Sequence, residues 1–192
     1  MTAVSIFGTG SMATAIAGVL AQGGADVQHV THAEAGSATL TGDVVVLGVP
    51  YPAVAEILDA HAEQLAGKVV VDITNPLDFS TFDSLVVPAD SSAAAQIQAA
   101  LPTATVLKAF NTTFATTLAS GTVGALPTTV LVAGDDDAAK QTLLGLVREG
   151  GLEAVDAGAL SRARELEAIG FLQLTLAAGE KISWTAGFGL AR

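Results

Sequence analysis

The 192-residue sequence has no cysteine, a single tyrosine and a single tryptophan, and only 8 basic residues against 19 acidic ones. The lack of cysteine excludes a disulfide framework and a thiolate metal site, and it is typical of a cytoplasmic protein. The formal net charge is −11, and no Lys or Arg occurs before Lys68. Nucleic-acid binding requires a basic surface, so the sequence argues against that class.

The sequence also lacks long apolar runs, although 51% of its residues are hydrophobic. No run approaches the roughly 20 residues of a membrane helix, and no basic segment precedes an apolar stretch near the start. We therefore expect a cytoplasmic protein without a membrane partner. Neither a metal-ligand spacing nor a Ser-His-Asp arrangement is found, so we assign no metal ligand and no catalytic residue.

The most informative segment that is present is residues 4–13, V-S-I-F-G-T-G-S-M-A. A short apolar strand runs into Gly8-x-Gly10-x-x-Ala13 and then into a helical pattern. Gly8 permits a tight turn, Gly10 lets phosphates approach the backbone, and Ala13 lets the helix lie close to the strand. The helix N-terminus offers free amides to an anion. This pattern predicts a dinucleotide site; the alternative is a structural glycine turn.

Strands and helices alternate along most of the chain, which predicts an α/β fold with a Rossmann-type, doubly wound parallel sheet. Only about a dozen residues separate the strand at 26–30 from the strand at 44–48, where a crossover helix and a third strand need more. We therefore expect the third strand to be shortened or missing. Residues 1–156 form the predicted dinucleotide-binding domain, and residues 157–192 form a small C-terminal strand-helix extension packed on it.

The end of the second strand, Val30-Thr31-His32, bears on the choice of nucleotide. An NAD site usually carries an acid there to hold the ribose 2′-hydroxyl, but Asp26 precedes the strand and Glu34 lies beyond it. The missing acid favours NADP over NAD, with Thr31 and His32 as donors. No Arg is available there to bind the phosphate. The alternative for His32 is an exposed turn residue without contact to the nucleotide.

Three later strands end at Val49-Pro50, Asn75-Pro76 and Asn111. Ligands of open parallel sheets bind beyond the carboxyl ends of the strands, so these residues are expected to share one crevice. The amides of Asn75 and Asn111 suit a carboxamide or a ring edge. Turn formation is the alternative for each Asn. Tyr51 is the one candidate proton donor, and a packing role is the more common use of such a residue.

Six motifs, in this order, resemble the NADPH-dependent coenzyme F420 reductases and their bacterial dinucleotide-binding relatives. They are Gly8-Thr9-Gly10-Ser11-Met12-Ala13, Gly48-Val49-Pro50, Asp72-Ile73-Thr74-Asn75-Pro76, Lys108-Ala109-Phe110-Asn111-Thr112, Gly134-Asp135-Asp136 and Asp156-Ala157-Gly158-Ala159-Leu160. The Lys108 motif also resembles the oxidoreductase domain of the STEAP ferric reductases. The resemblance implies a pyrophosphate at Thr9, Gly10, Ser11 and Met12, and a 2′-phosphate at Thr31 and His32. It places Val49 and Ala53 beside the cleft and Asn75 and Ala109 on the path to the nicotinamide.

The sequence therefore predicts an NADP-dependent oxidoreductase that moves a hydride between NADP(H) and a deazaflavin such as coenzyme F420, or a flavin. Such cofactors carry the chemistry themselves, so no acid–base residue is required. Two alternatives remain: an imine reductase of the pyrroline-5-carboxylate reductase type, and a dinucleotide-binding redox sensor without turnover. The last helix is apolar around most of its circumference, which with the resemblance predicts a homodimer through it. Arg162 and Arg164 could bind an anionic acceptor or simply pair with nearby glutamates.

Overall fold

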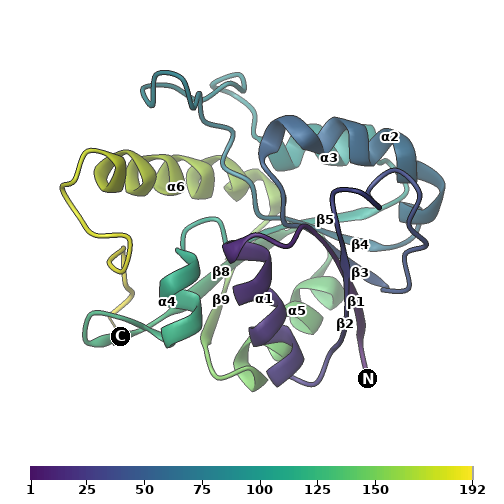
Figure 1. The fold of residues 1–192 in the computed structure, drawn as a ribbon, viewed down its shortest axis with the longest axis horizontal. Helices are drawn as coiled ribbons and strands as arrows, with labels where there is room; N and C mark the ends of the chain where they lie inside the picture. Colours follow the sequence, from purple (N-terminus) through teal and green to yellow (C-terminus); the bar gives the residue numbers. More distant parts are fainter. Residues whose placement is uncertain (192) are drawn as a thin grey trace.

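A computed structural model describes residues 1–191, and its centre is a seven-stranded sheet (Figure 1). The strand order is β2-β1-β3-β4-β5-β8-β9. The strands are β1 (Ala3–Phe7), β2 (Asp26–Val30), β3 (Val44–Leu47), β4 (Val69–Asp72), β5 (Thr105–Ala109), β8 (Thr129–Gly134) and β9 (Glu153–Gly158). A separate hairpin joins β6 (Thr122–Val123) and β7 (Leu126–Pro127). β3 reads V-V-V-L and is buried throughout, as expected for a parallel strand covered on both faces.

Helices cover both faces of the sheet. Their bounds are α1 (Ser11–Gln22), α2 (Val54–Leu65), α3 (Ala93–Ala100), α4 (Ala115–Ser120), α5 (Asp137–Glu149) and α6 (Ala163–Ala178), with 3₁₀ turns at η1 (Tyr51–Ala53) and η2 (Leu160–Arg162). In Figure 1, α1, α4 and α5 lie below the sheet, and α2, α3 and α6 lie above it. The helix starts follow capping rules: Ser92 accepts from the amide of Ala95, and Asp136 accepts from that of Ala139.

Alternate residues of the strands belong to two hydrophobic layers, one on each face of the sheet. Val4 and Ile6 of β1 pack with α1, α4 and α5, whereas Phe7 packs with α2 and α3. The same alternation divides the valines of β3 between the two layers. This arrangement confirms the predicted Rossmann-type α/β class. Within residues 1–191, no helix is both long enough and apolar enough to cross a bilayer.

The third strand of the standard doubly wound order is absent from the described chain, as predicted. β2 is the edge strand, and residues 31–43 form turns beside it. The buried side chain of His61 fixes this segment, since its Nε2 lies 2.5 Å from the carbonyl oxygen of Ala35. Gln64 adds a hydrogen bond to the carbonyl of Ala38. These contacts give the segment a defined path over α2 without a strand.

The sheet is not parallel throughout, which corrects the sequence prediction. β5 and β8 are antiparallel, with Lys108 opposite Ala133, and β9 then runs parallel to β8. The connection explains the reversal, because α4 has only six residues. A helix of that length spans about 9 Å, too short to carry the chain back along β5. The carboxyl end of β8 therefore points toward the side of the sheet where β1–β5 begin. The turn after Gly134 lies on that side, away from the carboxyl ends of β1–β5.

β2 spans the predicted residues 26–30, and β3 ends at Leu47, one residue before the predicted end. β9 continues to Gly158, so the predicted domain boundary after residue 156 falls inside a strand of the common sheet. α6 packs on that same sheet through the buried Ala163. The division of the chain into two parts stays a prediction.

Candidate functional site

The turn after β1 depends on two glycines whose backbones touch. Gly8 has φ +103°, and a Cβ there would stand 2.3 Å from the carbonyl oxygen of Gly48. A Cβ on Gly48 would in turn stand 2.7 Å from the carbonyl oxygen of Phe7 and 3.0 Å from the Cβ of Ala13. The ends of β1 and β3 and the start of α1 thus meet at backbone distance, for which only glycine and a small residue at position 13 leave room.

Gly10 presents the opposite situation, because its side-chain position is open. It is the N-cap residue of α1, and no heavy atom of the described chain lies within 4 Å of a Cβ built on it. Among residues 1–191 no side chain caps α1, and its first turn carries no acid. The first amides of α1 therefore face open space with a positive dipole end behind them. This arrangement can bind an anionic diphosphate.

A first cavity of about 360 Å³ lies between this turn, the end of β2, the end of β3 and α2. Its walls include eight predicted ligand residues: Gly8, Thr9, Gly10, Thr31, His32, Val49, Pro50 and Ala53. The remaining lining is largely apolar, with Glu56 as the one acid. Mostly apolar clefts with a few polar groups are typical of small-ligand sites. Ser11 faces away from this cavity, into an open groove between α1 and α4.

The polar end of the first cavity holds an interaction that the sequence analysis missed. Glu34 folds back so that its Oε2 accepts hydrogen bonds from the amide (3.0 Å) and hydroxyl (2.7 Å) of Thr31. These bonds lower the pKa of Glu34 below its usual value. The spacing Thr31-x-x-Glu34 is that of a capping box, a sequence signal that predicts this contact. His32 is exposed at the rim.

A second cavity of about 240 Å³ continues along the strand ends and shares Gly48, Val49 and Pro50 with the first. Its other walls are Met12, Tyr51, Ile73, Thr74, Asn75, Phe79 and Leu174. Phe79 and Leu174 were not predicted, since they come from the irregular segment after β4 and from α6. The hydroxyl oxygen of Thr74 is buried and has no hydrogen-bond partner among residues 1–191.

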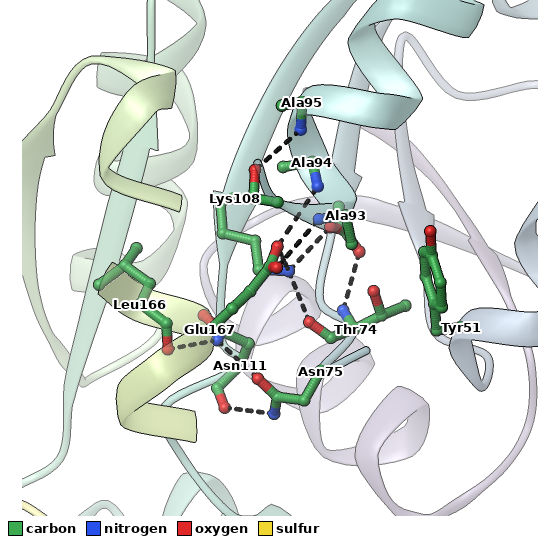
Figure 2. Close-up of polar contacts among 12 residues, drawn as sticks. Tyr51, Thr74, Asn75, Ala93, Ala94, Ala95, Lys108, Asn111, Leu166 and Glu167 are labelled. Atoms are coloured by element: carbon green, nitrogen blue, oxygen red, sulfur yellow. Dashed lines mark hydrogen bonds and ion pairs between the residues drawn. The ribbon is translucent and has the colours of Figure 1, made fainter. Parts of the chain in front are cut away.

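Asn75 and Asn111 do not both reach a cavity. They bind each other: Asn75 Nδ2 donates to the carbonyl of Asn111 (2.9 Å), and Asn111 Nδ2 donates to Asn75 Oδ1 (2.8 Å) and to the carbonyl of Leu166 (2.8 Å; Figure 2). Asn111 is 4% exposed and Ala109 is fully buried, and both lie outside the walls of the two cavities. Their contact with a ligand stays a prediction, and what the geometry shows is a clamp between β4, β5 and α6.

The clamp requires a glycine on α6, which gives a first testable prediction. A Cβ on Gly170 would stand 2.2 Å from Asn75 Oδ1 and 2.8 Å from the carbonyl oxygen of Asn111. Because α6 must shift to relieve this contact, we expect Gly170→Ala to lower the free energy of unfolding by about 1–3 kcal/mol in urea. Gly145→Ala is the control, since its Cβ meets no described atom within 4 Å. Equal unfolding midpoints for the two variants would contradict the clamp.

Beneath the second cavity lies a buried charge cluster built on Lys108. Its Nζ is 2.8 Å from Asp72 Oδ2 and 2.8 Å from Glu167 Oε1, and it also donates to the carbonyl of Thr74 (Figure 2). Glu167 further accepts the amide of Ala93 at 2.9 Å, at the start of α3. Burial raises the pKa of Glu167, and Lys108 partly opposes that rise. The cluster joins β4, β5, α3 and α6 directly under Asn75.

Tyr51 lies beside this cluster (Figure 2) and lines the second cavity. Its hydroxyl donates to Gln96 Oε1 at 2.6 Å. Burial, followed by the negative charges of Glu167 and Asp72, raises the pKa of Tyr51, so the phenol stays protonated at neutral pH. Tyr51 is thus a neutral wall of the cavity whose proton is already engaged.

Two arginines considered for an anionic acceptor are paired instead. Arg164 Nη2 lies 2.9 Å from Glu165 Oε1, and Arg162 Nη1 lies 3.7 Å from Glu165 Oε2. All three side chains are partly exposed, so these pairs contribute little stability. In the part of the chain that is described, no three His, Cys, Asp or Glu residues come together as a metal site.

Comparison with known proteins agrees with the sequence resemblance. Residues 20–76 match the family model of "NADP oxidoreductase coenzyme F420-dependent". The F420-dependent NADP reductase of Methanocaldococcus jannaschii is 33% identical over 132 residues, which are 67% of this chain and 59% of that protein. The metalloreductase STEAP3 of Rattus norvegicus is 37% identical over 108 residues, 56% of this chain and 21% of that protein.

Among solved structures, a provisionally assigned F420-dependent NADP reductase of Arthrobacter sp. FB24 superposes over all of both chains with TM-score 0.84 and 28% identity. Imine reductases at 15–17% identity share the fold alone. The chain spans about three fifths and one fifth of the lengths of the two curated relatives it matches.

Proposed function

We propose that this chain, which is related to the coenzyme F420-dependent NADP oxidoreductases, transfers a hydride between NADP(H) and a deazaflavin or flavin-like acceptor. One observation carries the proposal. The uncapped start of α1, with open space at Gly10, lies where two cavities meet along the carboxyl ends of β1, β3 and β4. An extended dinucleotide needs such a row: one cavity, an anion site and a second cavity.

The residues present fit a nicotinamide dinucleotide. The amides of Thr9 to Met12 would hold the diphosphate, and the first cavity would take the adenosine half with Thr31 and His32 at its ribose end. The second cavity would take the nicotinamide, with Thr74 and Asn75 as polar residues of its wall. When bound, the nucleotide supplies the hydride; the chain binds it, orients it and excludes water.

The walls of the second cavity favour a ring-shaped acceptor. Phe79 and Leu174 offer apolar surface next to the nicotinamide position, and Phe79 is 53% exposed. Hydride transfer between two ring systems requires stacking at about 3–3.5 Å rather than an acid–base residue. Reduction of an imine would require a proton donor, and the phenol of Tyr51 is bound to Gln96. The site therefore supports a flavin-like acceptor over an imine.

We also propose a homodimer formed through α6. This helix buries Ala163 and Leu166 against the sheet, while Ile169 and Leu172 are 36% and 50% exposed. A second copy of α6 would cover those apolar side chains. Light scattering of the pure protein would test the dimer, and Leu172→Glu should favour the monomer. The cytoplasmic location expected from the sequence stays a prediction.

The function is tested with pure protein by titrating NADPH and NADH and then following reduction of coenzyme F420, FMN or a cyclic imine. We expect NADPH to bind and F420 to be reduced, with one hydride and one solvent proton taken up per turnover. Reduction of the imine alone would favour the imine reductase alternative. Binding without reduction of any acceptor would favour the redox sensor.

A further inference from the structure

The contact between Thr31 and Glu34 lies at the ribose end of the first cavity. Thr31 lines that cavity, and both of its donors, the amide and the hydroxyl, are taken by one carboxylate oxygen at 3.0 and 2.7 Å. The turn that follows is closed by the amide of Glu34, which donates to the carbonyl of Thr31. Glu34 is thus held over the donors of Thr31 by both its backbone and its side chain.

We propose that Glu34 is an internal competitor for the 2′-phosphate of NADP(H), and that it narrows the preference of this chain for NADPH over NADH. The proposal rests on the proposed function, because it concerns the nucleotide of that same site. A carboxylate and a phosphate accept the same hydrogen bonds. To bind at Thr31, the phosphate must displace Glu34 and remain beside its negative charge.

The surroundings of the site offer little compensation for that charge. Among residues 1–191, the walls of the first cavity include no Lys or Arg, and their one acid, Glu56, adds a negative charge to that of Glu34. His32 is the one basic side chain among these described wall residues. The hydrogen bonds from Thr31 also keep the Glu34 carboxylate ionised to lower pH. A ribose 2′-hydroxyl, in contrast, can donate a hydrogen bond to the same carboxylate, as an acid at the end of this strand does in NAD sites.

Two substitutions at Glu34 distinguish the effect of its negative charge from its competition for the donors of Thr31. Glu34→Gln keeps an acceptor for both donors of Thr31 and removes the charge, whereas Glu34→Ala also frees both donors. Asp59→Asn is the matched control, because it removes one negative charge from an exposed position of α2 outside the cavity walls. Dissociation constants of NADPH and NADH are measured for each protein by nucleotide fluorescence at one fixed ionic strength.

We expect the ratio of the NADH to the NADPH dissociation constant to rise about tenfold in Glu34→Ala, to rise less in Glu34→Gln, and to stay unchanged in Asp59→Asn. Most of the change should appear as tighter NADPH binding, with a smaller loss of NADH binding because the acceptor for the ribose 2′-hydroxyl is removed. Unchanged ratios in both Glu34 variants, with nucleotide still bound, would overturn this proposal and leave the proposed function standing. If no protein in the series binds either nucleotide, both fail.

A second substitution tests whether Thr31 is the shared donor. In the wild-type chain Glu34 already occupies the hydroxyl, so Thr31→Val should change NADPH binding less than twofold. In the Glu34→Ala background the same change removes a freed donor and should weaken NADPH binding about fivefold. Equal effects of Thr31→Val in the two backgrounds would show that Glu34 does not compete for this hydroxyl, and would contradict the proposal.

Discussion

Lys108→Met should lower the free energy of unfolding by about 3–5 kcal/mol, since removing one partner of a buried ion pair leaves the other charge uncompensated. Lys108 is fully buried between Asp72 and Glu167, with 2.8 Å to a carboxylate oxygen of each. Methionine fills a similar volume, so the loss reflects the missing charge and hydrogen bonds rather than a cavity.

Urea unfolding at neutral pH measures this loss, with Lys181→Met as the control because Lys181 is exposed on the surface. The deficit should shrink as the pH is lowered. The pKa of Glu167 is already raised by burial, and removal of Lys108 takes away the group that opposes this rise. Protonation of Glu167 in acid then relieves the unpaired charge. A deficit that is small, or that does not depend on pH, would contradict the role given to the cluster.

Several features could be predicted from the sequence because they depend on local patterns. The turn at Gly8 and Gly10, the first helix and the missing third strand follow from spacing along the chain. The grouping of Thr31, Val49 and Asn75 near the strand ends follows from the rule that parallel strands end at one edge. Local spacing and this rule together place most predicted ligand residues in the two cavities.

Features that depend on contacts between distant parts of the chain were missed. The length of α4 decides that β8 runs antiparallel, and a sequence pattern does not show this. Lys108 meets Glu167 only because α6 returns across the end of β5, and Phe79 joins the second cavity through an irregular segment. Glu34 is different, since its capping-box spacing is local and could have been recognised.

Gly10→Val should strongly weaken nucleotide binding and leave the fold intact. The residue has extended backbone angles that valine adopts readily, and no described atom stands within 4 Å of its Cβ. Since valine is a poorer N-cap than glycine, we expect a stability loss of at most about 1 kcal/mol. The isopropyl group would occupy the space in front of the first amides of α1. We therefore expect NADPH and NADH binding to weaken together by about 100-fold, because both carry the same diphosphate.

Two further substitutions make this result specific to the diphosphate. Gly8→Ala places a methyl group 2.3 Å from the carbonyl oxygen of Gly48 at φ +103°, so it should lower both stability and binding. Gly18→Ala lies two turns along α1, where a Cβ meets no described atom within 4 Å, and should leave binding unchanged while raising stability by about 0.5–1 kcal/mol. If Gly10→Val bound both nucleotides normally, the diphosphate would have to lie elsewhere, and the assignment of the two cavities to the halves of a dinucleotide would fail with it.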